Sequence, residues 1–504
     1  MVAAGPPSPP AVRPRRALAA AAAGALVAGL LGWLLAPAPS TPGPQTTGDP
    51  ALAERLRAEA GAGRHGLVAA VVRDGRVTVA GIGDDGRGEP VGAATPFEIG
   101  SVTKTVTGAV LAELERRGEL RSDERVRDVL PGHPWRPGGA GDVTLAELAT
   151  HHAGLPRTPG GLAEFARGAV GANPYGNDVA DILAAADRAE LSGRGEHHYS
   201  NLGSALLGHA LAERAGTPYP QLVDEIVAGP LGMTGTAVLD APPPGAARSH
   251  DLAGRPQPVW LGAGDAPAGI GVWSTVDDLV RYAAATGDPS SPVALAAQPR
   301  ADSDLGRIGY GWEVLDAGGR TLLWKNGGVS GTWTTVLAEP ATGDAVVVFG
   351  NSGRPVDALA VRLLEAPSPF PGSGGGTAGL VRDGLPIVVG TLLPLLGGLT
   401  TLFGALGGRP GHRRRVNRVE FAGTAGSGLF FLAIAFMSGG VSWWLVVPWM
   451  LGCLAFGAGL GVAMAHWRGW DDAGGAARRA NAVIGLVLGL GAAGTLAAVG
   501  LGAI

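Results

Sequence analysis

The feature that most constrains the fold of this 504-residue chain is a set of apolar segments near its two ends. Each is about as long as a helix that crosses a bilayer. The first is Ala17–Ala36, which follows Arg13, Arg15 and Arg16. Four further stretches occupy 385–406, 421–438, 443–465 and 482–503. They predict an all-α transmembrane region at the C-terminus. A re-entrant hairpin or a buried soluble helix is the alternative for the weakest stretch, 421–438.

Composition divides the chain into five regions. The predicted regions are an N-terminal signal anchor or signal peptide (1–36), a linker (37–51), a globular domain (52–365), a second linker (366–384) and a C-terminal membrane region of about four helices (385–504). The linkers are rich in Pro, Ser, Thr and Gly. Ala36-Pro37-Ala38 resembles a signal-peptide cleavage site. Pro39 is a poor first residue for a mature chain, which favours an uncleaved anchor.

Basic residues predict the topology of these segments. They crowd the first and third connections of the C-terminal region, at Arg409, Arg413, Arg414, Arg415 and Arg418, and at Arg468, Arg478 and Arg479. The middle connection, Ser438–Ser442, has none. The positive-inside rule then places these two connections and the N-terminal arginines in the cytoplasm. The chain is expected to be a multi-pass protein of the cell membrane, in contact with the lipid bilayer, with its globular domain on the extracytoplasmic side.

Charge and cysteine content exclude several classes of function. The net charge is −4, so no general affinity for nucleic acid is implied. The one cysteine, Cys453, lies in an apolar stretch, which argues against an internal disulfide, a cysteine-cluster zinc site and a cysteine nucleophile. His151-His152 and His197-His198 are adjacent pairs, and neighbouring side chains rarely point the same way. Neither a metal nor another cofactor is therefore expected.

The globular domain reads as an α+β fold. The expected strands are 67–72, 77–81, 310–314, 321–324, 332–337 and 345–349, and the expected helices are 102–117, 145–150, 179–189, 203–215 and 275–285. Asp74-Gly75 between the first two strands is a strong hairpin signal. Because strands lie at both ends with helices between them, the terminal strands could meet in one antiparallel sheet.

Lysine is almost absent from the chain, which has only Lys104 and Lys325 among its 39 basic residues. Arginine stays protonated in proteins, whereas a lysine can lose its proton when burial or a nearby cation lowers its pKa. Lys104 follows Ser101 by three positions in a predicted helix, so the two side chains share a face. A serine in the first turn also meets free backbone N–H groups, and an uncharged amine can accept its proton.

Two further motifs support this pair. In Tyr199-Ser200-Asn201, the phenol could relay a proton, and the amide could bind a substrate carbonyl and hold Lys104. In Lys325-Asn326-Gly327-Gly328, the cation could lower neighbouring pKa values and attract a carboxylate. The N–H groups of Gly328 and Ser101 could form an oxyanion hole. Each motif alone also fits a structural role: an N-cap serine with a solvated lysine, a turn tyrosine with a capping Asn201, and a polar hairpin end.

In this order, the three motifs resemble the serine β-lactamase and penicillin-binding-protein superfamily, most closely its branch of class C β-lactamases, D-alanyl carboxypeptidases and esterases. The similarity also includes 143–156, Pro230-Leu231-Gly232-Met233, 269–279 and 310–312. It covers roughly residues 52–365. It implies a β-lactamase/transpeptidase-like fold, an antiparallel sheet with helices plus an all-α subdomain.

The resemblance also implies roles. Ser101 would be the acylated nucleophile, Lys104 its base partner and Tyr199 the general acid and base. The substrate-binding residues would be Asn201, Lys325, Asn326, Gly327 and Gly328. Of these, Asn201 would orient substrate and Lys325 would recognise a carboxylate. The third motif more often has Thr or Ser where Asn326 stands.

Two functions follow from the sequence. The first is a membrane-anchored, extracytoplasmic serine hydrolase that forms an acyl-enzyme with peptidoglycan-type D-amino-acid peptides, β-lactams or small esters. The alternative is a non-catalytic, penicillin-binding-like sensor or scaffold coupled to the C-terminal helices. The hydrolase is favoured because the serine and both lysines are present.

Overall fold

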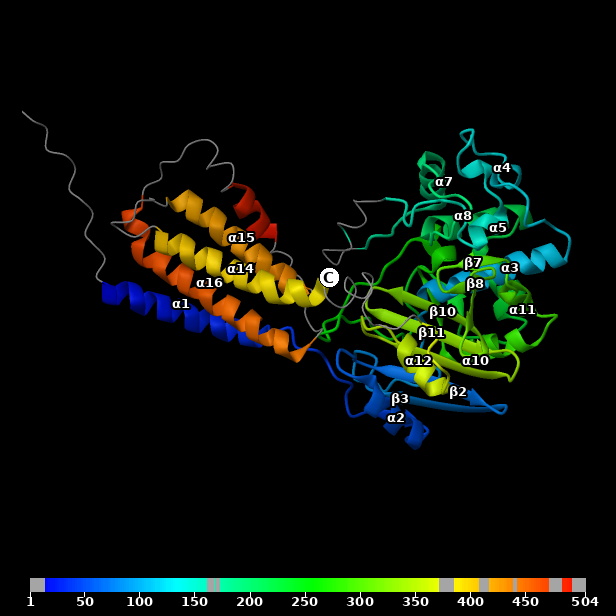
Figure 1. Cartoon of the computed structure of the whole chain (residues 1–504), viewed down its shortest axis with the longest axis horizontal. Helices are drawn as coiled ribbons and strands as arrows, with labels where there is room; N and C mark the ends of the chain where they lie inside the picture. The colour runs from blue at the N-terminus through cyan, green and yellow to red at the C-terminus, as the bar shows by residue number, and fades with distance from the viewer. Residues whose placement is uncertain are drawn as a thin grey trace, which may run out of the picture. The chain divides into compact units, whose positions relative to one another are not determined.

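The computed structural model describes residues 14–160, 167, 173–370, 385–407, 417–437, 442–470 and 483–491. The chain forms two compact units. One unit is Ser40–Gly372, and the other combines Met1–Pro39 with Ser373–Ile504 (Figure 1). Each unit is described below by itself.

An antiparallel sheet of nine strands is the framework of the first unit. In spatial order its strands are β1 (Thr46–Gly48), β3 (Arg76–Ile82), β2 (Leu67–Arg73), β12 (Asp344–Gly350), β11 (Thr332–Glu339), β10 (Thr321–Val329), β9 (Glu313–Asp316), β8 (Gly306–Ile308) and β7 (Ala301–Ser303). The N-terminal hairpin joins the C-terminal strands where β2 pairs with β12, with Ala70 opposite Val347. The prediction that strands from both ends of the domain sequence meet in one antiparallel sheet is confirmed.

The first hairpin turns at Asp74 and Gly75, whose φ angles are +49° and +74°. Two successive left-handed residues match the twist of the flanking strands, which is why Asp-Gly is favoured there. Side chains of β2 then alternate between two apolar cores. Val68 and Ala70 belong to one core, and Leu67 and Ala69 to the other.

Helices cover both faces of the sheet. On one face, α2 (Pro50–Ala60) and α12 (Asp357–Leu364) pack on the strands. On the other, α10 (Val276–Ala284) lies against β2 and β12, and α3 (Thr103–Arg116) packs on α8 (Asn201–Ala215) in the same core. The shorter helical segments are η1 (Gly100–Val102), α4 (Val126–Val129), η2 (Ala140–Asp142), α5 (Leu145–Ala149), α7 (Val179–Arg188), α9 (Tyr219–Val223), η3 (Asp224–Ala228), η4 (Ala263–Ala268), η5 (Ala285–Gly287) and α11 (Pro292–Ala297).

A second, three-stranded sheet was not predicted. It consists of β4 (Phe97–Glu98), β6 (Val272–Ser274) and β5 (Ala237–Val238). Strands of two or three residues carry too little alternation to be recognised in a sequence. This sheet leads directly into η1, so it sets where the segment after Glu98 enters the domain.

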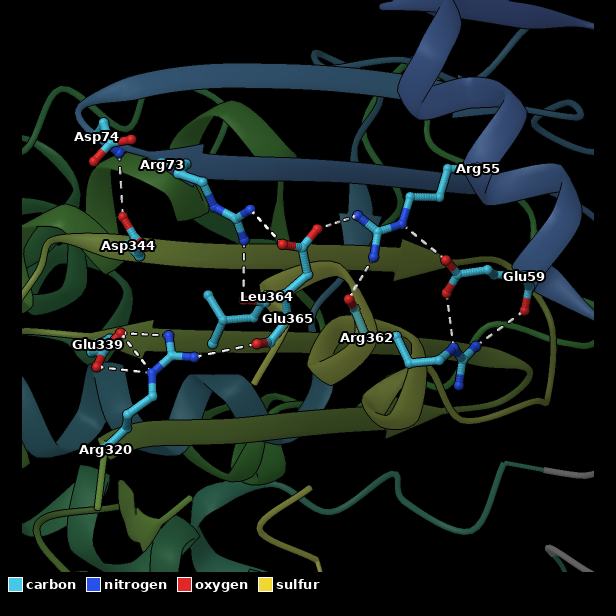
Figure 2. A network of polar contacts seen from close by, with 10 residues as sticks. All are labelled: Arg55, Glu59, Arg73, Asp74, Arg320, Glu339, Asp344, Arg362, Leu364 and Glu365. Atoms are coloured by element: carbon cyan, nitrogen blue, oxygen red, sulfur yellow. Dashed lines mark hydrogen bonds and ion pairs between the residues drawn. The ribbon is translucent and has the colours of Figure 1, made fainter. Parts of the chain in front are cut away.

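Ion pairs tie the outer helices to the sheet and to each other (Figure 2). The carboxylate of Glu365, just after α12, lies 3.0 Å from Arg55 of α2 and 2.8 Å from Arg73 of β2. Glu59 of α2 pairs with Arg362 of α12 at 2.8 Å. Exposed pairs of this kind contribute little stability one by one. They link α2, α12 and β2, whose apolar side chains share one core.

The second unit consists of long apolar helices that run side by side (Figure 1). They are α1 (Pro14–Leu34), α14 (Leu385–Gly407), α15 (Arg418–Met437) and α16 (Val446–His466), with the short turns η7 (Trp443–Leu445) and η8 (Trp467–Gly469) beside α16. Among the described residues, four helical stretches could cross a membrane by length and composition: 14–34, 387–407, 418–437 and 443–466. The fourth predicted C-terminal span, 482–503, lies largely outside the described residues. Its described part, 483–491, is helical.

Within this unit, α1 packs closely on α16. A Cβ atom added to Gly24 would lie 2.1 Å from the carbonyl oxygen of Gly457, and one on Gly461 would lie 2.0 Å from that of Ala20. The indole Nε1 of Trp449 also donates a hydrogen bond of 2.8 Å to the carbonyl of Gly32. Small residues that allow such an approach are typical of helix pairs in membranes.

Several predicted boundaries differ from the structure. The segment expected as a linker, 37–51, includes β1, which pairs with β3, and Asp49, whose side chain caps α2. The strand expected at 310–314 begins at Glu313, and β10 continues past Trp324 to Val329. The helix expected at 203–215 begins at Asn201, because Ser200 rather than Asn201 is its N-cap.

Candidate active site

Ser101 lies where the small sheet passes into α3. The sequence predicts it in the first turn of an α-helix, whereas the structure places it in the 3₁₀ turn η1, which continues directly into α3 at Thr103. Gly100, the first residue of η1, has a φ of +55° and makes the sharp turn after β4. The three-residue spacing to Lys104 still brings both side chains to the same side.

Lys104 contacts Ser101 directly. Its Nζ lies 2.9 Å from the Ser101 Oγ and donates a hydrogen bond of 2.5 Å to the carbonyl of Ala268 in η4. Burial is the main cause that lowers the Lys104 pKa to about 8; nearby Lys325 and Arg157 act in the same direction, and Tyr199 opposes them. Near neutral pH, part of this amine is therefore uncharged and can accept a proton from serine.

Tyr199 closes the constellation from the N-terminal side of α8. Its phenol oxygen lies 2.6 Å from the Ser101 Oγ. The Nζ atoms of Lys104 and Lys325 each lie 5.0 Å from the centre of its ring. Burial would raise the Tyr199 pKa, but the two ammonium groups outweigh it and lower the pKa to about 7. The phenol can therefore gain and lose a proton near neutral pH.

The third motif lies on β10, beside Ser101. Strand β9 pairs with β10 only as far as Trp324, and η1 lies against β10 beyond that point. A Cβ atom on Gly327 would lie 1.9 Å from the carbonyl oxygen of Ile99 and 2.8 Å from the backbone nitrogen of Ser101. Only glycine permits this approach. It places the backbone of the third motif next to the Ser101 N–H, as an oxyanion hole requires.

The predicted binding residues have different environments. Lys325 is 4% exposed and Asn326 is half-buried. Asn201 is buried, and its side-chain nitrogen donates to the Tyr175 hydroxyl at 2.9 Å. Among the described residues, its buried Oδ1 has no hydrogen-bond partner. The sequence predicts a contact between Asn201 and Lys104. Within the described part of the chain, no hydrogen bond joins these two side chains. Ala268 holds the lysine instead.

His151 holds the backbone on both sides of Tyr199. Its carbonyl accepts a hydrogen bond of 2.8 Å from the His198 N–H, and its Nδ1 accepts one of 3.3 Å from the Ser200 N–H. Burial, with Lys325 and Lys104 nearby, lowers the His151 pKa well below its ordinary value. A neutral ring can keep accepting at Nδ1. The backbone φ of His151 is +63°, which is uncommon for a residue other than glycine.

Motif spacing gave no signal for several neighbours of the site. The tertiary fold alone brings four residues next to the three motifs: Ala268, Tyr175, Arg157 and His151. Of these, His151 lies in a segment with family similarity, Arg157 and Ala268 each lie next to one, and Tyr175 lies outside them. Among the described residues, no group of three or more His, Cys, Asp or Glu side chains could hold a metal ion.

Glu98 is a buried carboxyl three residues before Ser101. It is 2% exposed, and its Oε1 accepts a hydrogen bond of 2.8 Å from the Gly271 N–H. Burial raises its pKa to about 8, and this hydrogen bond opposes the rise only in part. The folded protein therefore holds a proton on Glu98 through a pH range in which the unfolded chain has lost it.

We expect Glu98→Gln to flatten the pH dependence of stability. In the wild type, the free energy of unfolding should fall between about pH 4.5 and pH 8, because the unfolded state binds fewer protons there. The slope contributed by one group is at most about 1.4 kcal/mol per pH unit. Glutamine is neutral and keeps an acceptor for Gly271. Thermal unfolding of the detergent-solubilised chain at pH 5 and pH 8 measures the difference, with Glu54→Gln as an exposed control. An unchanged pH dependence in Glu98→Gln contradicts the expectation.

Comparison with known proteins places this geometry in a family. Residues 52–366 match a family model described as Beta-lactamase. The D-alanyl-D-alanine-carboxypeptidase/endopeptidase AmpH of Escherichia coli (strain K12) is 33% identical over 186 residues, which are 36% of this chain and 47% of that protein. Esterase EstB of Burkholderia gladioli is 32% identical over 212 residues, 38% of this chain and 52% of that one. These alignments thus span about half the length of each relative.

Solved structures share the fold. The class C beta lactamase from Rhodobacter sphaeroides has a TM-score of 0.52 and 25% identity, over 62% of this chain and 96% of that one. The octameric penicillin-binding protein homologue from Pyrococcus abyssi has a TM-score of 0.53 and 24% identity, over 63% of this chain and 76% of that one. The predicted fold class, a β-lactamase/transpeptidase-like α+β domain followed by a helical region, is confirmed.

Proposed function

The chain belongs to the beta-lactamase family through residues 52–366, and on this basis we propose that it is a serine hydrolase whose acyl-enzyme forms on Ser101. One observation carries the proposal. The Ser101 hydroxyl contacts both the Lys104 amine and the Tyr199 phenol, and both of these groups have a pKa lowered toward neutrality. Serine is otherwise a weak nucleophile, and an adjacent base is what activates it.

The proposed reaction begins with attack of the Ser101 oxygen on a carbonyl carbon. Its proton passes to Lys104 or to ionised Tyr199, both within hydrogen-bond distance. The backbone N–H groups of Ser101 and Gly328 would stabilise the negative charge that develops on the carbonyl oxygen. Tyr199 would return a proton to the leaving group, and water would then release the acyl group from Ser101.

The proposed substrates are D-amino-acid peptides of the peptidoglycan type, β-lactams or small esters. Support comes from the names of the relatives, which include a D-alanyl-D-alanine carboxypeptidase, beta-lactamases and an esterase. All three chemistries displace a leaving group from an acyl carbon. Lys325, buried beside Tyr199, supplies the positive charge that would attract a substrate carboxylate.

The test is to find the site of acylation. A fluorescent penicillin or a fluorophosphonate should label the protein, and peptide mass spectrometry should find the adduct on Ser101. Hydrolysis of a panel of D-alanyl peptides, β-lactams and p-nitrophenyl esters would then rank the substrates. An adduct on another residue removes Ser101 as the nucleophile. Stable labelling with no turnover of any substrate would favour the sensor or scaffold, which the Asn326 difference also motivates.

We further propose that the protein is embedded in the membrane, with residues 52–365 on the extracytoplasmic side. The four long apolar helices support this proposal, as does the excess of arginine in the first and third C-terminal connections. The close packing of α1 on α16 supports an uncleaved N-terminal anchor, because cleavage would leave the Gly457 and Gly461 face of α16 without its partner. The chain on both sides of residues 52–365 would then lead to the bilayer.

Cys453 is the only cysteine, so the topology can be tested by cysteine labelling. In a Cys453→Ser background, Ser290→Cys in the hydrolase domain should react with a membrane-impermeant maleimide on intact cells. Arg468→Cys, at the third connection, should react only after the membrane is permeabilised. An epitope at the N-terminus should stay on the labelled band. The reverse pattern of labelling contradicts the orientation, and loss of the epitope contradicts the retained anchor.

A further inference from the structure

Arg157 brings a third positive charge to the site. Its guanidinium carbon lies 4.9 Å from the centre of the Tyr199 ring. Lys104 and Lys325 are 3% and 4% exposed, whereas Arg157 is exposed. Within the described part of the chain, the Arg157 side chain has no ion pair and no hydrogen bond. It is therefore the cation of this group that a bound ligand can reach.

The positive charges of the site are not paired with carboxylates in the part of the chain that the structure describes. No ion pair among the described residues involves Lys104, Lys325 or Arg157. Lys325 and Arg157 both lower the Lys104 pKa. The side chains that shift the Tyr199 pKa most include no carboxylate. The chain as a whole carries a net charge of −4. A local excess of cations in an acidic protein is complementary to an anionic ligand.

The backbone places Arg157 on the Asn201 side of the site. The Arg157 carbonyl accepts hydrogen bonds from the N–H groups of Asn201, at 2.8 Å, and Leu202, at 3.4 Å. These bonds fix the start of α8 against the loop that carries Arg157. Asn201 also has the unpartnered Oδ1 that would bind the acyl part of a substrate. A substrate whose acyl part lies beside Asn201 therefore has the loop that carries Arg157 as its neighbour.

We propose that Arg157 binds a carboxylate on the acyl portion of the substrate, so that the preferred substrates are anionic acyl donors. The proposal rests on the function proposed above. It assigns a second anion site, separate from any carboxylate on the leaving-group side that Lys325 would attract. Arginine suits this role because its planar fork can donate two parallel hydrogen bonds to one carboxylate.

Arg157 could instead act only by tuning Tyr199 and Lys104, and substrate charge separates the two roles. A tuning residue alters the rate for every substrate by the same factor. An anion-binding residue alters the rate only for substrates that carry the anion. Mono-p-nitrophenyl glutarate and p-nitrophenyl valerate provide a matched pair. They share a leaving group and a five-carbon acyl chain, and only the glutarate ester ends in a carboxylate.

The experiment compares kcat/KM for the two esters with the full-length protein in detergent micelles. The wild type should prefer the glutarate ester by roughly tenfold to a hundredfold, the range expected for a hydrogen bond to a charged group. Arg157→Gln should remove this preference by raising KM for the glutarate ester. Any change that it causes through the Lys104 pKa should alter the rates for both esters by the same factor. Arg157→Lys should keep part of the preference. Arg188→Gln, an exposed arginine on α7, is the control and should behave as wild type.

Salt provides a second measurement. The preference of the wild type should fall as ionic strength rises, because the guanidinium is exposed. Equal loss of both activities in Arg157→Gln, or no preference in the wild type, overturns the anion site. If Ser101 forms an adduct and both esters are hydrolysed at equal rates, only the Arg157 proposal is wrong. If neither ester is hydrolysed and no adduct forms on Ser101, the proposed function is wrong, and the Arg157 proposal falls with it.

Discussion

Ser101→Ala is expected to reduce kcat/KM by about four orders of magnitude or more, the scale seen when a nucleophile is removed from a serine hydrolase. The physical reason is the position of one oxygen atom. The Ser101 Oγ lies 2.6 Å from the Tyr199 hydroxyl and 2.9 Å from the Lys104 Nζ. Alanine leaves the acid, the base and the backbone N–H groups in place but removes the atom that forms the acyl bond.

A p-nitrophenyl ester assay and a fluorophosphonate label measure this loss independently. Ser290→Ala is a suitable control, because Ser290 is exposed and its hydroxyl bonds only to Asp288 among the described residues. The control should hydrolyse and label as wild type does. Retention of more than about one per cent of the wild-type rate by Ser101→Ala would mean that another group attacks the substrate, since the remaining groups supply much less catalysis.

Lys104→Met is expected to reduce kcat/KM by about 10²- to 10⁴-fold, the usual contribution of a positioned acid or base. Methionine fills a similar volume in this buried position but cannot take the Ser101 proton. It also leaves the Ala268 carbonyl without the hydrogen bond that Lys104 donates, which should cost about 1–3 kcal/mol of stability. The thermal unfolding midpoint shows whether the variant is folded under assay conditions.

The pH profile distinguishes a catalytic role of Lys104 from a structural one. The wild type should show a bell-shaped kcat/KM. The rate should rise near pH 7, where the Lys104 and Tyr199 pair loses the first of its two protons, and fall above about pH 8, where it loses the second. Lys104→Met removes a cation that lowers the Tyr199 pKa, so the rising limb of any residual rate should move to higher pH.

Lys104→Arg is the matched control for charge. Arginine keeps the positive charge and the donor to Ala268, but it does not deprotonate in proteins. It should be as inactive as Lys104→Met while being more stable than that variant. Wild-type rates in Lys104→Arg would show that an uncharged amine is not required at this position.

Short sequence patterns correctly predicted the hairpins and helices that depend on residues close together in the chain. The hairpin at Asp74-Gly75 and the long helix after Ser101 appear where the sequence indicated them. The order of the three motifs predicted that Ser101, Lys104, Tyr199 and Lys325 would lie close together, and the structure brings them together. The proposed roles of Ser101 and Lys104 are the ones that the substitutions above test.

The sequence did not reveal contacts that depend on distant segments. Ala268 holds Lys104 through its carbonyl, which any residue could provide, so no side chain marks the position. Glu98 looks like an ordinary charged residue beside an apolar one, and only the small sheet explains its burial. Tyr175 reaches Asn201 across a loop. Such contacts are set by tertiary packing, which neither periodicity nor propensity encodes.

The pairing of β2 with β12 bears on how the protein is made. During synthesis, the first hairpin emerges long before its neighbour in the sheet exists, and the edge of β2 stays open until then. Contacts between such distant parts of a chain form slowly, and open strand edges invite association with other chains. The domain cannot finish folding until its last strand has left the ribosome, so any truncation before Gly350 should yield an aggregating product instead of a smaller hydrolase.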